Sequence, residues 1–142
     1  MGSPRGLAFD SAGNLYTAIS SNNTIEKFTS TGGVLSSTGS VFTSSGVNSP
    51  VSLAFDSAGN LYLANGGNNT IEKYTSTGGV LSSSGSVFAN STNGVSSIPR
   101  RLAFTDDNGV PLPLANQVPE PASLGLLGLG ACLLAARRRR NG

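Results

Sequence analysis

Two aspartates, Asp10 and Asp56, occupy matching places in the identical segments LAFDSAGNLY that begin at Leu7 and Leu53. The catalytic groups of a single active site should occur once and so differ between the copies of an internal repeat. These two carboxylates instead occur in both copies. Each opens an Asp-Ser-Ala-Gly-Asn turn, where a carboxylate can accept backbone N–H bonds and a glycine such as Gly13 can adopt positive φ. We therefore expect both aspartates to cap turns.

Asp106 and Asp107 are the carboxylates that do break the repeat. With Asn108 and Gly109 they offer oxygen ligands of the kind that hard cations prefer. The alternate carboxylates and distal glutamate of a calcium loop are missing, however, and Asp-Asp-Asn-Gly is also a favourable hairpin turn. We expect a turn here and no metal site.

The residue inventory gives little support to catalysis. The chain has no histidine, and its one cysteine is Cys132. An imidazole base, a Ser–His pair and a histidine-ligated metal are therefore excluded, and no Gly-rich phosphate loop of the P-loop type occurs. We expect no catalytic residues, no metal, no cofactor and no enzymatic activity of this chain alone.

The first part of the chain is a repeat with a period of 46 residues. Between Gly6–Phe42 and Ser52–Phe88, 30 of 37 positions are identical, and a partial third copy starts at Pro99 with PRRLAF. Each copy contains short strand-like runs separated by turns, which in the first copy are GLAF, LYTAI, TIEKFT and VLSST. Four antiparallel strands per repeat of this length are typical of a propeller blade. The sequence thus predicts an all-β fold without helices in this part.

Alternation within TIEKFT places Ile25 and Lys27 on one face of the strand and Glu26 and Phe28 on the other. The pairs Glu26–Lys27 and Glu72–Lys73 follow the repeat, and we expect them on solvated strand faces. Outside a terminal arginine block the chain has five basic and seven acidic residues. This balance argues against nucleic acid as a partner.

The pattern P-x-x-L-A-F-D-S-A-G-N-L-Y-x-A followed by N-N-T-I-E-K-F resembles the NHL repeat family of β-propellers. The family has an aspartate after the Y-x-A strand, where this chain has Ile19 and Asn65. The resemblance implies a domain over residues 1–116, with repeats at 4–49 and 50–98 and a partial one at 99–116. It implies little about function, because one fold serves many functions.

Closed propellers typically have four to eight blades, more than this chain supplies. No apolar segment typical of a signal peptide follows Met1. We expect either that the sequence is part of a longer product with earlier blades and an export signal, or that blades of several chains assemble.

The C-terminal segment differs in composition from everything before it. A Pro-Glu-Pro motif, Val118–Pro121, precedes fifteen small or apolar residues at 122–136 and an arginine cluster, Arg137–Arg140. A helix of that length spans about 22 Å, less than the ~30 Å of a bilayer core, but arginine side chains can reach the interface. The sequence predicts a short transmembrane helix with its arginines in the cytoplasm, and a soluble core helix is the alternative.

These parts, in this order at the end of the chain, resemble the PEP-CTERM sorting domain, here residues 117–142. The same tail is sometimes catalogued as an ice-binding protein C-terminal domain, but long regular threonine arrays are absent and we do not expect ice binding. The resemblance implies a sorting motif at Val118, Pro119, Glu120 and Pro121, and topology determinants at Arg137, Arg138, Arg139 and Arg140. It also implies processing by exosortase, a membrane protease-transpeptidase of Gram-negative bacteria.

The resulting hypothesis is an exported, non-catalytic bacterial propeller protein. It would first be held in the inner membrane with its blades on the periplasmic side, and later reach the cell surface or the exopolysaccharide matrix. Two alternatives remain open. One is a piece of a lactonase- or lyase-like propeller enzyme whose active-site blades lie elsewhere, and the other is a module that binds polysaccharide or protein.

Overall fold

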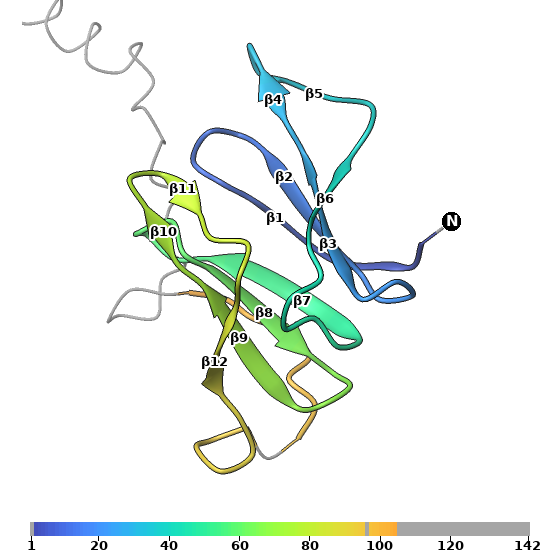
Figure 1. Ribbon diagram of the computed structural model, residues 1–142, viewed down its shortest axis with the longest axis vertical. Helices are drawn as coiled ribbons and strands as arrows, with labels where there is room; N and C mark the ends of the chain where they lie inside the picture. Colours follow the sequence, from blue (N-terminus) through green and yellow to red (C-terminus); the bar gives the residue numbers. More distant parts are fainter. Residues whose placement is uncertain (1, 96, 105–142) are drawn as a thin grey trace, which may run out of the picture.

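The computed structural model describes residues 2–95 and 97–104, and their regular structure is entirely β (Figure 1). It forms two four-stranded antiparallel sheets, one for each full copy of the repeat, which confirms the all-β prediction. The first sheet has the order β1-β2-β3-β6 and the second the order β7-β8-β9-β12. The strands are β1 (Pro4–Phe9), β2 (Leu15–Ile19), β3 (Thr24–Phe28), β6 (Ser40–Thr43), β7 (Pro50–Phe55), β8 (Leu61–Asn65), β9 (Thr70–Tyr74) and β12 (Ser86–Ala89).

The expected fourth strand, VLSST, was placed wrongly. Val34–Leu35 (β5) pairs with Ser30–Thr31 (β4) in a separate two-stranded hairpin, and the second copy repeats this with β10 (Ser76–Thr77) and β11 (Val80–Leu81). Gly32 and Gly33 have φ values of 60° and 81°, a conformation that favours a tight turn. The turn folds the chain back on itself, so the fourth strand of the sheet starts only at Ser40.

The core lies between the two sheets. Alternate residues of β2 and β3 face β7, β8 and β9, and the central cluster consists of Tyr16, Ala18, Ile25, Leu53, Leu61, Leu63 and Tyr74. Tyr16 meets Phe42 and Phe55 edge to face, with ring centroids 5.4 and 5.3 Å apart. This is the arrangement that aromatic rings prefer. The alternation expected for β3 is confirmed, since Ile25 faces this core and the Lys27 ammonium lies over the Tyr16 ring.

The first strands of the two sheets, β1 and β7, lie very close together at Gly6. A Cβ at this position would lie 2.7 Å from the Ser52 Cα and 3.0 Å from the Leu53 nitrogen. Backbone atoms cannot move aside as the end of a side chain can. Glycine is therefore required at position 6 by the packing of β1 on β7, although the repeat has a serine at the equivalent position 52.

Residues 44–49, which join β6 to β7, cross over the second sheet. Ser45 and Gly46 accept hydrogen bonds there from the Tyr74 hydroxyl (2.7 Å) and the Asn65 side-chain nitrogen (2.6 Å). The Asn65 side-chain oxygen accepts a third bond from the Asn48 N–H (2.9 Å). These bonds tie the connection between the sheets to β8 and β9.

Glu72 is buried near this crossing segment, which corrects the expectation that both Glu–Lys pairs lie on solvated faces. Its exposed fraction is 5%. Burial raises the pKa of the carboxyl, and the Thr70 hydroxyl, 3.4 Å away, offsets this only in part. Glu26, its equivalent in the first sheet, stays partly exposed.

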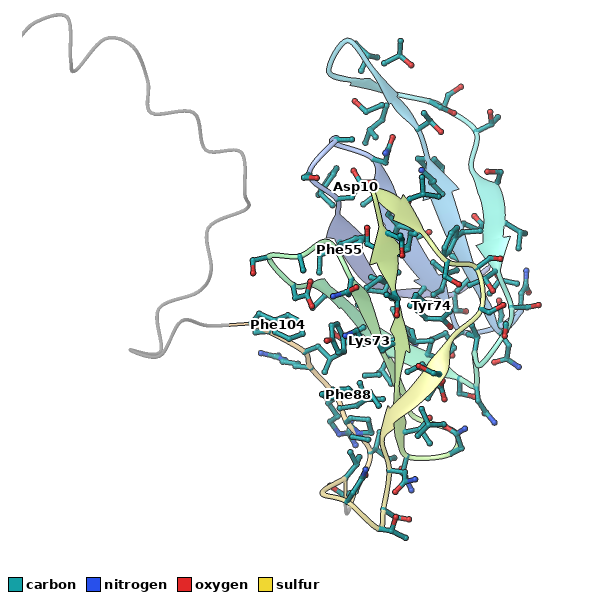
Figure 2. The ribbon with its side chains drawn as sticks, turned by 60° about the vertical axis from the view of Figure 1, so that its left-hand side comes forward. Asp10, Phe55, Lys73, Tyr74, Phe88 and Phe104 are labelled. Carbon is teal, nitrogen blue, oxygen red and sulfur yellow. The ribbon has the colours of Figure 1, made fainter. Side chains whose placement is uncertain are left out.

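The start of the third copy packs on the side of the second sheet that faces away from the first, without forming a strand. The Phe104 ring lies 4.8 Å from the Tyr62 ring, much as Phe55 meets Tyr16. The Leu102 N–H donates to the Ser52 hydroxyl (3.1 Å). Figure 2 shows Phe88 and Phe104 on this side and Tyr74 on the side toward the first sheet.

The expected transmembrane helix at 122–136 lies outside the described residues. Within residues 2–95 and 97–104, no helix has the length and hydropathy that would let it cross a bilayer.

We predict that Gly6→Ala lowers the free energy of unfolding by about 1–3 kcal/mol, the usual effect of overpacking a dense contact. Thermal or urea unfolding measures the change. The matched control is Ser52→Ala at the equivalent position, which already has a Cβ; it removes only the hydrogen bond from the Leu102 N–H and should cost about 1 kcal/mol. Equal stability of the wild type and Gly6→Ala would show that the two strands are not held this closely.

We predict that Glu72→Gln raises the melting temperature at pH 7. Because the folded-state pKa is raised above its unfolded value, the charged carboxylate destabilises the fold at neutral pH. This penalty disappears when the pH falls through the raised pKa and the group is protonated, so the two proteins should converge in acid. Glu26→Gln is the control and should change little. A Glu72→Gln protein that melts earlier than the wild type at pH 7 would mean that the carboxylate is stabilising.

Candidate functional site

A cleft of about 380 Å³ opens between the two sheets at the end where the aspartate turns lie. The 10–14 turn forms one side and the 56–59 turn the other. Tyr16, Lys27, Phe42 and Phe55 form its aromatic and basic interior, and the β10–β11 hairpin contributes Val80 and Leu81. The cleft thus contains elements of both repeats, positioned by the packing of the sheets.

The aspartates act in the turns, as the sequence predicted. The Asp10 carboxylate accepts bonds from the Ala12 and Asn14 N–H groups (3.0 and 2.9 Å) and from the Asn14 side-chain nitrogen (2.8 Å). The Asn14 side-chain oxygen in turn accepts from the Ser30 N–H (2.8 Å), which joins the turn to the start of the hairpin.

Asp56 makes the same bonds in the second copy, to Ala58 and Asn60 at 3.0, 2.9 and 2.8 Å. Partial burial opposes its charged form, but the hydrogen bonds from Asn60 and Ala58 outweigh this and hold its pKa below the ordinary value. A carboxylate whose oxygens are already bonded and whose pKa is lowered is a weak base at neutral pH. Both copies of the turn are therefore suited to stabilise the fold.

Tyr16 and Lys27 are polar residues that line the cleft from neighbouring strands. Burial raises the pKa of the Tyr16 hydroxyl, and the Lys27 ammonium opposes this increase. The Lys27 nitrogen lies 5.3 Å from the centre of the Tyr16 ring, within range of a cation–π interaction. Lys73 and Tyr62 repeat the contact at 5.4 Å in the second sheet. The arrangement offers a ligand one ammonium and aromatic surface.

Within residues 2–95 and 97–104, no three carboxylate, thiol or imidazole side chains come together in a way that would hold a metal ion. Asp106 and Asp107 lie outside this range. So do the sorting residues Val118, Pro119, Glu120 and Pro121 and the arginines at 137–140.

Sequence reasoning did not find the cleft or the buried Glu72. Tyr16 and Lys27 are eleven positions apart in the sequence, and they become neighbours only because β2 pairs with β3. One difference between the copies could have indicated the contacts around Glu72. The first copy has Ile19 where the second has Asn65, and Asn65 is the residue that binds the crossing segment, residues 44–49.

Comparison with solved structures supports a propeller-like fold. The X-ray structure of a protein provisionally named a gluconolactonase, target DrR130 of the Northeast Structural Genomics Consortium, matches with a TM-score of 0.54 and 20% sequence identity. The match covers 75% of this chain and 33% of that one, so the chain spans about a third of its length. At this identity the similarity concerns the fold alone. No curated protein matches the sequence.

The tail matches a known family model. Residues 117–140 match the PEP-CTERM protein-sorting motif, in agreement with the resemblance noted in the sequence. The matched segment includes the Pro-Glu-Pro motif, the apolar run and the arginines. The chain therefore carries a PEP-CTERM protein-sorting motif after its β-sheet region.

Proposed function

We propose that the chain is an exported, non-catalytic propeller protein of the NHL type, sorted by exosortase to the cell surface or exopolysaccharide matrix of a Gram-negative bacterium. The match of residues 117–140 to the sorting motif carries this proposal. The two sheets serve in it as blades, with a third blade beginning near Pro99. The residues that act in sorting are Val118–Pro121 and Arg137–Arg140.

The chemistry of the tail suits temporary anchoring. The apolar run at 122–136 holds the chain in the inner membrane, and the arginines keep the C-terminus in the cytoplasm. The sheets then lie on the periplasmic side, with Pro119–Pro121 next to the membrane. Proline lacks an N–H and restricts its neighbours to extended conformations, so this segment pairs poorly with a helix or sheet and remains accessible to a protease.

The residues of the cleft and the composition of the chain support a non-catalytic role. Asp10 and Asp56 use their oxygens in identical turns. The chain has no histidine to act as a base near neutral pH. The cleft is better suited to binding than to bond cleavage.

A second candidate function is part of a propeller lactonase. The observation that favours it is the fold similarity to the protein provisionally named a gluconolactonase, of which the chain spans a third. Catalytic groups would then come from blades outside residues 2–104.

We predict that Glu120→Ala abolishes release of the protein from the membrane. The chain is expressed behind an export signal in a host that has exosortase, and its membrane and released fractions are compared by immunoblot. Asn116→Ala, just before the motif, is the control and should be released like the wild type. Equal release of the Glu120→Ala protein would contradict recognition of the Pro-Glu-Pro motif.

We predict that the purified chain does not hydrolyse aldonolactones, as measured by proton release at pH 7. Asp56→Ala removes the hydrogen bonds that hold the turn, so it should lower the free energy of unfolding by about 1–3 kcal/mol and leave the background rate unchanged. Turnover by the wild-type chain above the background rate would contradict the absence of catalysis.

A further inference from the structure

Asparagine followed by glycine is a labile sequence that occurs in two very different environments of this fold. The chain has four such pairs, beginning at Asn65, Asn93, Asn108 and Asn141, and the first two lie within the described residues. Asparagine is a thermolabile residue, and a following glycine has no side chain to keep its nitrogen away from the asparagine amide. The surroundings of Asn65 and Asn93 therefore decide which of these two pairs reacts.

Asn93 and Gly94 are exposed in the turn that follows β12 (Figure 1). Among the described residues, the Gly94 nitrogen has no hydrogen-bond acceptor. A Cβ at Gly94 would meet no described atom within 4 Å. In the described part of the chain, this nitrogen is thus unrestrained and open to solvent.

The turn also activates the Asn93 amide. The Asn93 side-chain oxygen accepts a hydrogen bond from the Asn90 N–H (2.6 Å). A nucleophile that adds to the amide carbon places negative charge on this oxygen. An N–H donor that is already directed at the oxygen stabilises that charge.

Asn65 is buried and held by hydrogen bonds on both sides of its amide. Its side-chain nitrogen donates to the Gly46 carbonyl oxygen (2.6 Å), and its side-chain oxygen accepts from the Asn48 N–H (2.9 Å). The Gly66 nitrogen donates to the Ser49 carbonyl oxygen (3.0 Å). These bonds have to open before the pair can react, and local opening costs free energy.

We propose that Asn93 is a site of spontaneous deamidation in the folded protein, with Gly94 as the internal nucleophile. The Gly94 nitrogen loses its proton to a solvent base and bonds to the Asn93 side-chain carbon, and the amide nitrogen leaves as ammonia. Water then opens the five-membered imide at either carbonyl, which gives aspartate or isoaspartate. The net reaction exchanges ammonia for water and adds one negative charge.

The isoaspartate product opens the turn. The N–H groups of Asn93 and Val95 both donate to the Asn90 carbonyl oxygen (3.1 and 2.9 Å). In isoaspartate the main chain runs through the side-chain carbon, which inserts one carbon atom between residues 93 and 94. The bond from the buried Val95 then no longer spans the turn.

The test incubates the full-length chain in mild detergent, in neutral and in mildly alkaline buffer, and follows each pair by peptide mass spectrometry with fragmentation that localises the change. We expect Asn93 to be converted, and faster in the alkaline buffer because the nucleophile is the deprotonated nitrogen. Asn65 should be converted at least roughly tenfold more slowly, because it must first open.

Two controls separate sequence from structure. In urea, where both pairs lose their folded environment, Asn65 and Asn93 should be converted at similar rates. Asn93→Gln should suppress conversion at this position, because the longer side chain would have to close a six-membered ring.

Hydrogen exchange of the Val95 N–H tests the effect on the turn. It should be faster in the isoaspartate form than in freshly purified Asn93→Asp, which has the same charge and an ordinary main chain.

Equal conversion of Asn65 and Asn93 in the folded protein would overturn the proposal, as would protection of Asn93 by folding as strong as that of Asn65. Unchanged exchange of the Val95 N–H in the isoaspartate form would contradict the opening of the turn.

Discussion

The architecture depends on a backbone contact that only glycine permits. At Gly6 the first strands of the two sheets lie too close for any side chain. This approach brings the Tyr16 ring onto Phe55 and aligns the two aspartate turns on either side of one cleft. The same position carries a serine in the second sheet, and there the next segment is bonded through that hydroxyl and forms no strand. The equivalent position thus has no side chain where the two sheets pack together, and a hydrogen-bonding side chain where the third copy begins.

Much of the fold was predictable because its determinants are local. The 46-residue period, the alternation in β2 and β3, and the Asp-Ser-Ala-Gly-Asn turns are all evident in the sequence. The position of the fourth strand was not, because β5 has the composition of a sheet strand and only the two glycines before it divert it into a hairpin. The burial of Glu72 was equally hidden. It depends on a segment more than twenty residues away that bonds to Asn65 and Tyr74.

The candidate site likewise has features that the sequence predicts and features that only the fold brings together. The role of the aspartates followed from turn chemistry, whereas the Tyr16–Lys27 contact needed strand register to become visible. The sorting motif was recognisable because its residues are contiguous and require no tertiary contact. The sorting motif thus depends on a linear segment alone, whereas the cleft depends on contacts between residues far apart in the sequence.

Removal of the tail is the central step of the proposed sorting, and peptide mapping by mass spectrometry of the protein at the cell surface tests it directly. We expect the mature C-terminus to lie near Pro119–Pro121, with residues 2–104 present and the arginine cluster absent. Peptides from the surface protein that span Pro121 to Arg137 intact would contradict it.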